Sequence, residues 1–278
     1  MKVRQAAWAG QFYPDSPEQL KQMINSYLKM AEPMELGNPI VGLVSPHAGY
    51  VYSGRTAAVG YKQVEGRSVE TVVVLAPSHG TFIEGVSIYD GDLYRTPLGD
   101  VPIDKSRSRE IAEAASTIHL GESGHSADGD RAEHALEVQL PFLQMVLSSF
   151  KLVAGVFHDY SWENCRSLGE AIADVCDPQS TLIVASSDLY HGESYDDCLR
   201  TDTDTLNSLE QDTPIQFCFN ANHHKIMACG AGPIAALKTA GEQWGASAPR
   251  VISRTNSADV MGKHNGYVVG YAAAVMTL

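Results

Sequence analysis

The chain has 278 residues, of which 44% are hydrophobic and 19% are charged. These fractions are typical of a folded globular protein with enough apolar side chains for a core, and they exclude a disordered or collagen-like chain. Lys and Arg number 20 against 33 Asp and Glu, which gives a formal net charge of −13. Because binding to nucleic acids depends on clustered basic residues, this balance argues against a nucleic-acid partner.

The lack of an evident targeting signal and the pattern of cysteines both indicate a cytoplasmic protein. The longest apolar run, residues 267–276, has about half of the roughly 20 residues that a membrane-spanning helix needs, so no membrane association is expected. The N-terminus lacks the unbroken apolar segment of a signal peptide. An odd number of cysteines without a CxxC pair argues against a disulfide framework or a zinc ribbon. These cysteines are Cys165, Cys176, Cys198, Cys218 and Cys229.

The predicted elements alternate between helices and strands. The first helix covers residues 17–28, with Ser16 as its N-cap and Pro17 in its first position. Short apolar runs rich in β-branched residues predict strands at residues 40–45, 71–76, 152–157, 181–186, 251–254 and 267–276. Helical patterns lie between them at residues 106–116, 135–149, 162–176, 194–209, 214–222 and 231–242. This alternation predicts an α/β fold, a three-layer α/β/α domain with a mixed, largely parallel central sheet, and one domain over residues 1–278.

Three of the predicted strands end in the same way, with an apolar run, a small residue or proline, and then a histidine. The histidines are His47, His79 and His191, and Asp188 precedes the last of them. Ligands bind beyond the carboxyl ends of the strands in open α/β sheets, so parallel strands would bring these side chains to one edge. Imidazole is the commonest metal ligand and also transfers protons near neutral pH. A metal or acid/base site is therefore expected there.

Asp188 has two readings that the sequence leaves open. It lies three residues before His191, close enough to accept that histidine's ring N–H or to act as a second acid/base group. Aspartate is also favoured in Asx turns and at helix N-caps.

Cys229 differs from the other cysteines in its position. It precedes Gly230 and Gly232, which permit a close backbone approach, and Pro233, which suits a helix start. A thiol just before a helix N-terminus is expected to have a lowered pKa, which favours metal binding or nucleophilic attack. A small buried residue in a tight turn is the alternative.

Residues 133–137 open a predicted helix with Glu133, His134 and Glu137. A His-x-x-Glu pair on consecutive turns can hold a metal or orient its ligands. We expect His134 and Glu137 to orient the metal ligands without binding the metal themselves. Acidic residues also favour the first helical turn through the helix dipole, which is the competing explanation. No glycine-rich nucleotide loop follows a strand, so no nucleotide cofactor is indicated.

Seven separated motifs resemble those of the Memo family, in the same order and over essentially the whole chain. They are AGQFYP at residues 9–14, SPHAGY at 45–50, APSH at 76–79, LYRTPL at 93–98, EHALEVQLPF at 133–142, SDLYH at 187–191 and ACG at 228–230. In prokaryotes this family is also called AmmeMemoRadiSam system protein B. That name implies a functional link to a radical SAM protein and an AMMECR-type protein.

The fold of the Memo family resembles that of LigB-type class III extradiol dioxygenases, which use non-haem ferrous iron. The resemblance implies that His47 and His79 match two metal ligands and that His191 matches the acid/base histidine. Cys229 falls where those dioxygenases place a carboxylate ligand. Because a thiolate is softer than a carboxylate, the change shifts metal preference toward copper, zinc or a thiolate-bound iron.

Three functions remain open at this point. The first is a mononuclear oxidoreductase that binds Fe(II) or Cu through His47, His79 and Cys229, with His191 and Asp188 handling protons. The second is a metal-free adaptor whose histidine-lined crevice binds a peptide, a small molecule or an anion. The third is a zinc hydrolase in which the metal activates a bound water. We expect the first, with zinc as the weaker alternative metal.

Overall fold

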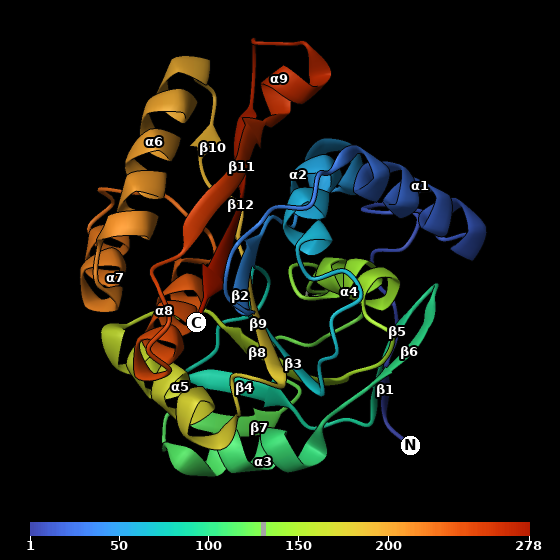
Figure 1. Ribbon diagram of the computed structural model, residues 1–278, viewed down its shortest axis with the longest axis vertical. Coiled ribbons are helices and arrows are strands. Elements are labelled where there is room, and N and C mark those ends of the chain that lie inside the picture. Colours follow the sequence, from blue (N-terminus) through green and yellow to red (C-terminus); the bar gives the residue numbers. More distant parts are fainter. Residues whose placement is uncertain (129–131) are drawn as a thin grey trace.

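A large mixed sheet forms the centre of the protein (Figure 1). The computed structural model describes residues 1–128 and 132–278. Along the sheet lie β10 (His191–Gly192), β12 (Val268–Thr277), β2 (Ile40–Ser45), β9 (Thr181–Ser186), β3 (Thr71–Pro77), β8 (Lys151–Phe157), β4 (Val86–Tyr89) and β7 (Ile118–Gly121). A further strand, β11 (Arg250–Asn256), pairs with β12. The central strands β2, β9, β3 and β8 are mutually parallel, whereas β12 and β4 run antiparallel to β2 and β8.

The sequence of the central strands explains their position. Strand β3 reads TVVVLAP and every residue in it is buried, as are all residues of β2 and β9. Strands covered on both faces read as continuous apolar runs rich in β-branched residues, rather than as alternating patterns. The parallel register is what places the carboxyl ends of β2, β9 and β3 at one edge of the sheet.

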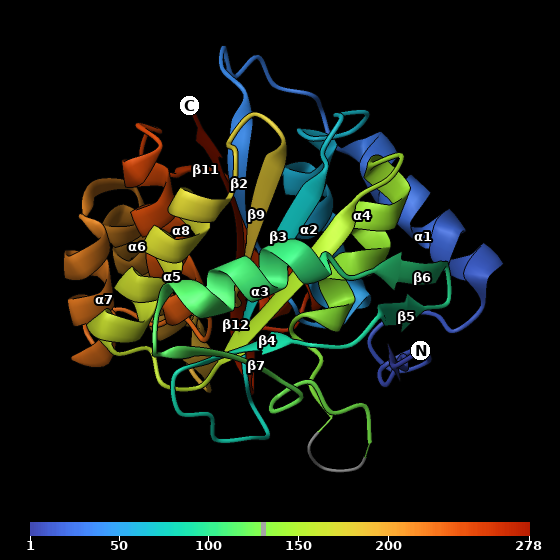
Figure 2. The ribbon, with the colours of Figure 1, turned by 90° about the horizontal axis from the view of Figure 1, so that it is seen from below.

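Helices cover both faces of the sheet (Figures 1 and 2). One face packs against α1 (Pro17–Met30), α2 (Tyr50–Lys62) and α4 (Leu140–Val146). The opposite face packs against α3 (Lys105–Ala114), α5 (Trp162–Val175), α6 (Tyr195–Gln211), α7 (Pro214–Asn222) and α8 (Ala231–Gln243). The predicted α/β fold with a flanked, mixed central sheet is thereby confirmed. Nothing in this arrangement tests the prediction of a single domain over residues 1–278.

Smaller elements complete the described structure. A separate three-stranded sheet has the order β1 (Val3–Arg4), β5 (Leu93–Thr96) and β6 (Gly99–Pro102). The short helix α9 (Ser257–Met261) follows β11, and the 3-10 turn η2 (Glu137–Gln139) leads directly into α4.

The structure differs from the sequence-based prediction at two helices. Helix α2 was not predicted, because most of its surface is buried, including Gly54, Ala57 and Tyr61, and its sequence has no clear amphipathic pattern. The helix predicted over residues 135–149 is shorter. Pro141 has no N–H and occupies the first turn of α4, so the preceding residues form only a 3-10 turn.

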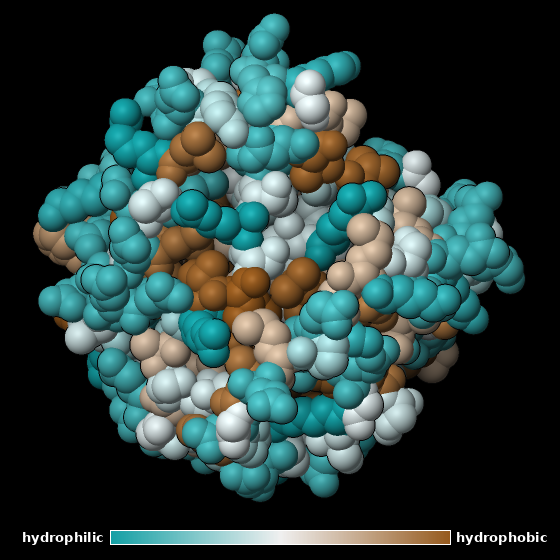
Figure 3. Space-filling view, turned by 45° about the horizontal axis from the view of Figure 1, so that its top comes forward, coloured by the Kyte–Doolittle hydropathy of each residue, from teal (hydrophilic) through white to brown (hydrophobic). Residues whose placement is uncertain are grey.

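The length and hydropathy of the described helices bear on membrane insertion. None of the described helices is long and apolar enough to cross a bilayer. On the face in Figure 3, apolar side chains gather near the centre and polar side chains cover most of the margin.

Lys238 is an unusual buried cation on α8. It is 3% exposed, donates to the carbonyl of Leu209 and lies 5.6 Å from the ring centre of Phe217. Burial lowers its pKa from 10.5 to about 8. Because the unfolded chain then binds the proton more tightly, the free energy of unfolding should rise with pH between about 8 and 10.5.

Replacing this lysine by methionine tests the effect, since Lys238→Met keeps the length of the side chain and removes the titrating group. From pH 7 to pH 10 the wild type should gain about 2 kcal/mol of stability relative to the variant. Urea unfolding of both proteins at the two pH values measures this difference. A difference that does not change with pH would contradict a depressed pKa.

Candidate metal centre

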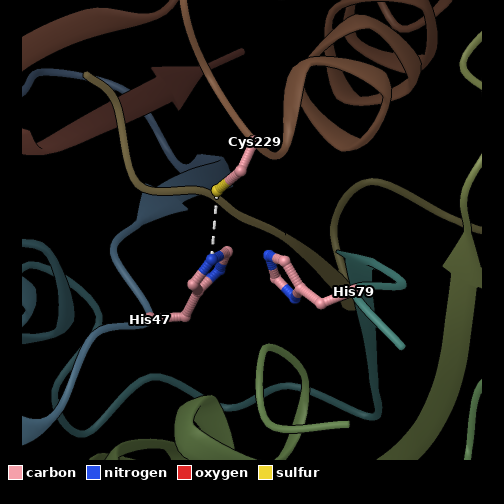
Figure 4. Close-up of side chains that lie close together, drawn as sticks. All are labelled: His47, His79 and Cys229. Carbon is pink, nitrogen blue, oxygen red and sulfur yellow. Dashed lines mark hydrogen bonds between the residues drawn. The ribbon is translucent and has the colours of Figure 1, made fainter. Parts of the chain in front are cut away.

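The parallel strands bring His47 and His79 together. His47 lies two residues after β2, and His79 lies two residues after β3, on either side of β9. Their ring centres are 5.3 Å apart with an interplanar angle of 81°. Cys229 approaches the same point from the segment before α8 (Figure 4). Three segments far apart in sequence therefore converge beyond the carboxyl ends of the central strands.

The hydrogen bonds of His47 fix its tautomer. Its Nδ1 lies 2.9 Å from the hydroxyl of Ser186. That hydroxyl donates its single proton to the carbonyl of Ala135 (2.6 Å) and accepts from the amide of Gln139 (2.8 Å). Ser186 therefore accepts from Nδ1–H of His47, which leaves a lone pair on Nε2. Burial lowers the pKa of His47 well below 6.5, so the ring is neutral, as a metal ligand must be.

Glu133 orients the ring of His79. Its Oε1 lies 3.1 Å from Nδ1 of His79, and its Oε2 accepts from the backbone N–H of the same residue. The backbone N–H groups of His134 and Ala135 donate to Oε1, both at 2.8 Å. Burial acts to raise the pKa of Glu133, but the donors outweigh it and lower the pKa to about 2. Burial acts to lower the pKa of His79, but the hydrogen bond to this ionised carboxylate outweighs it and raises the pKa, so a metal ion at Nε2 would have to displace the second ring proton.

Cys229 completes the group, but its protonation differs from expectation. Its Sγ lies 3.1 Å from Nε2 of His47 and also accepts from the backbone N–H of Asp188 at 3.1 Å. The sequence predicted a lowered pKa because of the following helix. Instead, burial raises the pKa of the thiol, and the nearby Asp188 carboxylate adds to the shift. The S–H therefore donates to Nε2 of His47, and binding of a cation would have to release this proton.

The three donors fit a metal ion. The ligand atoms of His47, His79 and Cys229 lie within 4.8 Å of one another. A tetrahedral ion with bonds of about 2.0–2.3 Å holds its ligands roughly 3.3–3.8 Å apart, so small side-chain movements would suffice. Two imidazole nitrogens and one sulfur suit a borderline or soft ion such as zinc, copper or iron. Three protein ligands also leave a coordination position for water or substrate.

Asp188 lies against these donors. Its Oδ1 accepts from the backbone N–H groups of His47 (2.8 Å) and Ala48 (3.3 Å), and its Oδ2 lies 4.0 Å from Nε2 of His47. Burial raises its pKa to about 7. A carboxyl group with this pKa exchanges a proton near neutral pH, as an acid/base group requires.

His191 approaches from β10, which pairs with β12. Its Nδ1 lies 3.0 Å from the carbonyl of Leu189, so Nδ1 carries a proton and Nε2 has a lone pair. Asp188 is therefore not the acceptor for Nδ1–H, in contrast to one of the two sequence-based readings. Burial lowers the pKa of His191, and the charge of His79 contributes to the shift.

Of the two residues expected to orient the ligands, the structure places His134 beside the histidine rings and Glu137 away from them. His134 stacks on His79 with ring centres 4.7 Å apart and lies 5.3 Å from the ring of His47. Glu137 contacts neither histidine ring; its carboxylate binds Arg4, the backbone of Ala7 and Trp8, and the hydroxyl of Tyr13. Its η2 turn directs it toward the N-terminal segment rather than toward the strand ends.

The residues that orient the ligands were largely missed by sequence analysis. Ser186 is the last residue of β9, and Gln139 reaches it from η2. Glu133 was noted in the sequence as able to face the site, but the carboxylate singled out was Glu137. No spacing rule could have found these contacts, because each joins segments about 50 residues apart: Glu133 to His79, and Gln139 to Ser186.

Glu133→Gln should weaken metal binding. A glutamine cannot accept from all four N–H groups that face the carboxylate, and its amide N–H₂ would oppose the backbone N–H or the Nδ1–H of His79. Loss of an outer hydrogen-bond partner of this kind typically costs roughly 10–100-fold in metal affinity. Competition with a chelating indicator gives the affinity. The exposed Glu84→Gln is the control, and equal affinities for the two variants would exclude a role for Glu133 in orienting His79.

Comparison with known proteins agrees with the sequence motifs. A profile of Memo-like proteins matches residues 4–275, nearly the whole chain. The chain belongs to the Memo family. A MEMO1 family protein of Nitrosopumilus maritimus is 35% identical over 276 residues, which covers 98% of both chains. Family members of Aeropyrum pernix and Aquifex aeolicus are 35% and 33% identical over 285 and 281 residues, and the alignments cover at least 98% of each chain.

Proposed function

We propose that this Memo family member is a mononuclear metal-dependent oxidoreductase whose ion is held by His47, His79 and Cys229. The observation that carries the proposal is the convergence of three ligand atoms within 4.8 Å, with a hydrogen bond that leaves Nε2 of His47 unprotonated and another that orients the ring of His79. Fe(II) and Cu are proposed over Zn because an oxidoreductase needs an ion that changes its oxidation state, which Zn does not. A bound ion of this kind would supply Lewis acidity and electron transfer at the open coordination position.

The residues around this position provide proton transfer. Asp188 has a pKa of about 7 and lies 4.0 Å from Nε2 of His47. His191 has a free Nε2 and a lowered pKa, so it is available as a base at neutral pH. We assign these two side chains to the acid/base role, in a reaction resembling those of class III extradiol dioxygenases.

A small molecule is the proposed substrate, and the family name further supports a functional link to a radical SAM protein and an AMMECR-type protein. His79 is 39% exposed at its side chain, whereas His47 is 2% exposed. Solvent therefore reaches the donors from the side of His79. A ligand entering from that side would meet His79 first.

Elemental analysis of anaerobically purified protein tests the proposal. The wild type should contain, or take up on reconstitution, about one iron or copper ion per chain. Oxygen uptake by the loaded protein with candidate substrates would then identify the reaction. If anaerobic reconstitution with Fe(II), Cu(I) and Zn(II) yields no bound metal, the same crevice is a binding pocket, as in the adaptor reading. Stoichiometric zinc with no uptake of iron or copper would favour the hydrolase reading.

A further inference from the structure

Two cysteines outside the proposed metal ligands lie close together, on α5 and α7. Cys165 is in the first turn of α5, and Cys218 is in the middle of α7. Both thiols point at the same backbone carbonyl, that of Tyr160, with Sγ to oxygen distances of 3.6 and 3.3 Å. Because the two thiols share this one acceptor, their sulfur atoms are neighbours. All five cysteines are free thiols in this structure.

The surroundings give the two thiols different roles. The side-chain amide of Asn222 donates to Sγ of Cys218 at 3.4 Å and to the Tyr160 carbonyl at 3.2 Å. A sulfur that accepts from an amide N–H is stabilised as a thiolate. The neighbouring Cys165 lowers the pKa of Cys218, and the same contact raises the pKa of Cys165. Cys218 therefore has the character of the attacking sulfur and Cys165 that of its partner.

We propose that Cys165 and Cys218 form a redox-active dithiol that a small hydroperoxide converts to a reversible intramolecular disulfide. Hydrogen peroxide is the probe of this class. The Cys218 thiolate attacks one peroxide oxygen, which breaks the O–O bond, forms a sulfenic acid and releases hydroxide. The sulfur of Cys165 then attacks the sulfur of Cys218, the S–O bond breaks, and the oxygen leaves as water. In sum, two thiols and one peroxide give one disulfide and two waters.

Burial explains why a small oxidant is required. Cys165 and Cys218 are 0% and 1% exposed, so a bulky disulfide cannot reach either sulfur in the folded protein. Helix α7 has only nine residues, and its Ile215 and Phe219 are 49% and 50% exposed. A short helix with exposed apolar side chains opens locally at low cost, which admits a small molecule to the pair.

The pair is connected to the metal centre through Tyr160. A Cβ atom on Gly232, in the first turn of α8, would lie 2.6 Å from the Cβ of Tyr160, so this residue packs directly against the helix that follows Cys229. Disulfide formation removes both S–H donors from the Tyr160 carbonyl and leaves Asn222 as its partner. The dithiol nevertheless contains none of the proposed metal ligands, so it can be tested independently of metal binding.

Thiol mapping of the full-length protein tests the proposal. Reduced protein is treated with hydrogen peroxide, alkylated before reduction, and digested for peptide mass spectrometry. The expected result is a linked pair of peptides containing Cys165 and Cys218, reversed by dithiothreitol. The crosslink should also form in Cys229→Ser and in Cys198→Ala, whose cysteine bonds Asp202 instead. It should be lost in Cys218→Ala, whereas Cys165→Ala should leave a sulfenic acid that dimedone traps at Cys218.

Several outcomes would overturn the assignment. Alkylation of both Cys165 and Cys218 after peroxide treatment, under conditions that oxidise Cys229, would show that the pair is inert. A crosslink to Cys229 would show that a different pair reacts. An equal oxidation rate with glutathione disulfide would exclude the assignment to small hydroperoxides. Near-ultraviolet circular dichroism of each alanine variant establishes that a lost crosslink does not come from a lost fold.

Discussion

Cys229→Ser should lose most of its bound metal while keeping its fold. A serine hydroxyl stays protonated at neutral pH and is a much poorer donor to soft ions than a thiolate. Loss of an outer partner alone costs roughly 10–100-fold in affinity, so loss of a direct ligand should cost more than about 100-fold. The sulfur hydrogen-bonds to His47 and Asp188, and serine can retain both contacts. The fold should therefore survive, and elemental analysis gives the metal content.

The matched control for this prediction is Cys198→Ser. Cys198 is also buried and hydrogen-bonded to a carboxylate, that of Asp202, but it lies on α6 and outside the group of ligand atoms. Its replacement should leave the metal content at the wild-type level. If both variants, or neither, lose metal, Cys229 is not a specific ligand. His47→Ala should behave as Cys229→Ser does, since either change leaves two donors.

Arg4→Met should destabilise the fold by about 3–5 kcal/mol, because it leaves a buried carboxylate without its counter-charge. Arg4 is 4% exposed and pairs with Glu137, which is fully buried. The guanidinium also donates to the carbonyls of Glu133 and Ser126. Methionine fills much of the same volume but provides none of these donors. Urea or thermal unfolding at neutral pH measures the loss.

The control for this prediction is an ion pair between an arginine and an aspartate at the surface. Arg95 binds Asp100 at 2.6 Å, but the two side chains are 43% and 33% exposed. Exposed ion pairs are worth at most about 1 kcal/mol, so Arg95→Met should have little effect. Similar losses in the two variants would show that burial of the Arg4–Glu137 pair does not matter. Because Arg4 also holds the backbone of Glu133, its loss should reduce metal affinity in the protein that remains folded.

Local sequence signals determined most of the central layer. The buried runs of β2, β3 and β9 are so rich in β-branched residues that their type and position follow from composition alone. Strand β2 ends where it was predicted to end, and β3 extends one residue further. Helix α1 begins at Pro17 after Ser16, whose side chain accepts from the backbone of Gln19, as the capping pattern predicted. In each case the deciding interaction is between neighbours in the chain.

The same reasoning failed where long-range packing decides the structure. Helix α2 has no clear amphipathic pattern, since most of its surface is buried. Strands β4, β5, β6 and β7 have four residues each, which is too short for a periodic pattern to be read. The prediction of a lowered pKa for Cys229 was also wrong, because burial raises the pKa by more than the following helix could lower it.

By itself, the sequence determined the family, the α/β alternation, the histidines that follow the strands, and the cysteine that precedes α8. The repeated pattern of apolar run, breaker and histidine needs only neighbouring residues, and parallel strands necessarily end on one edge. Only the tertiary structure decided which carboxylate serves the site. Glu133 and Glu137 lie in one motif four residues apart, but Glu133 reaches His79 whereas Glu137 reaches Arg4. That choice depends on the backbone directions at Glu133, which precedes the short 3-10 turn, and at Glu137, which begins it, and on two segments more than 50 residues away.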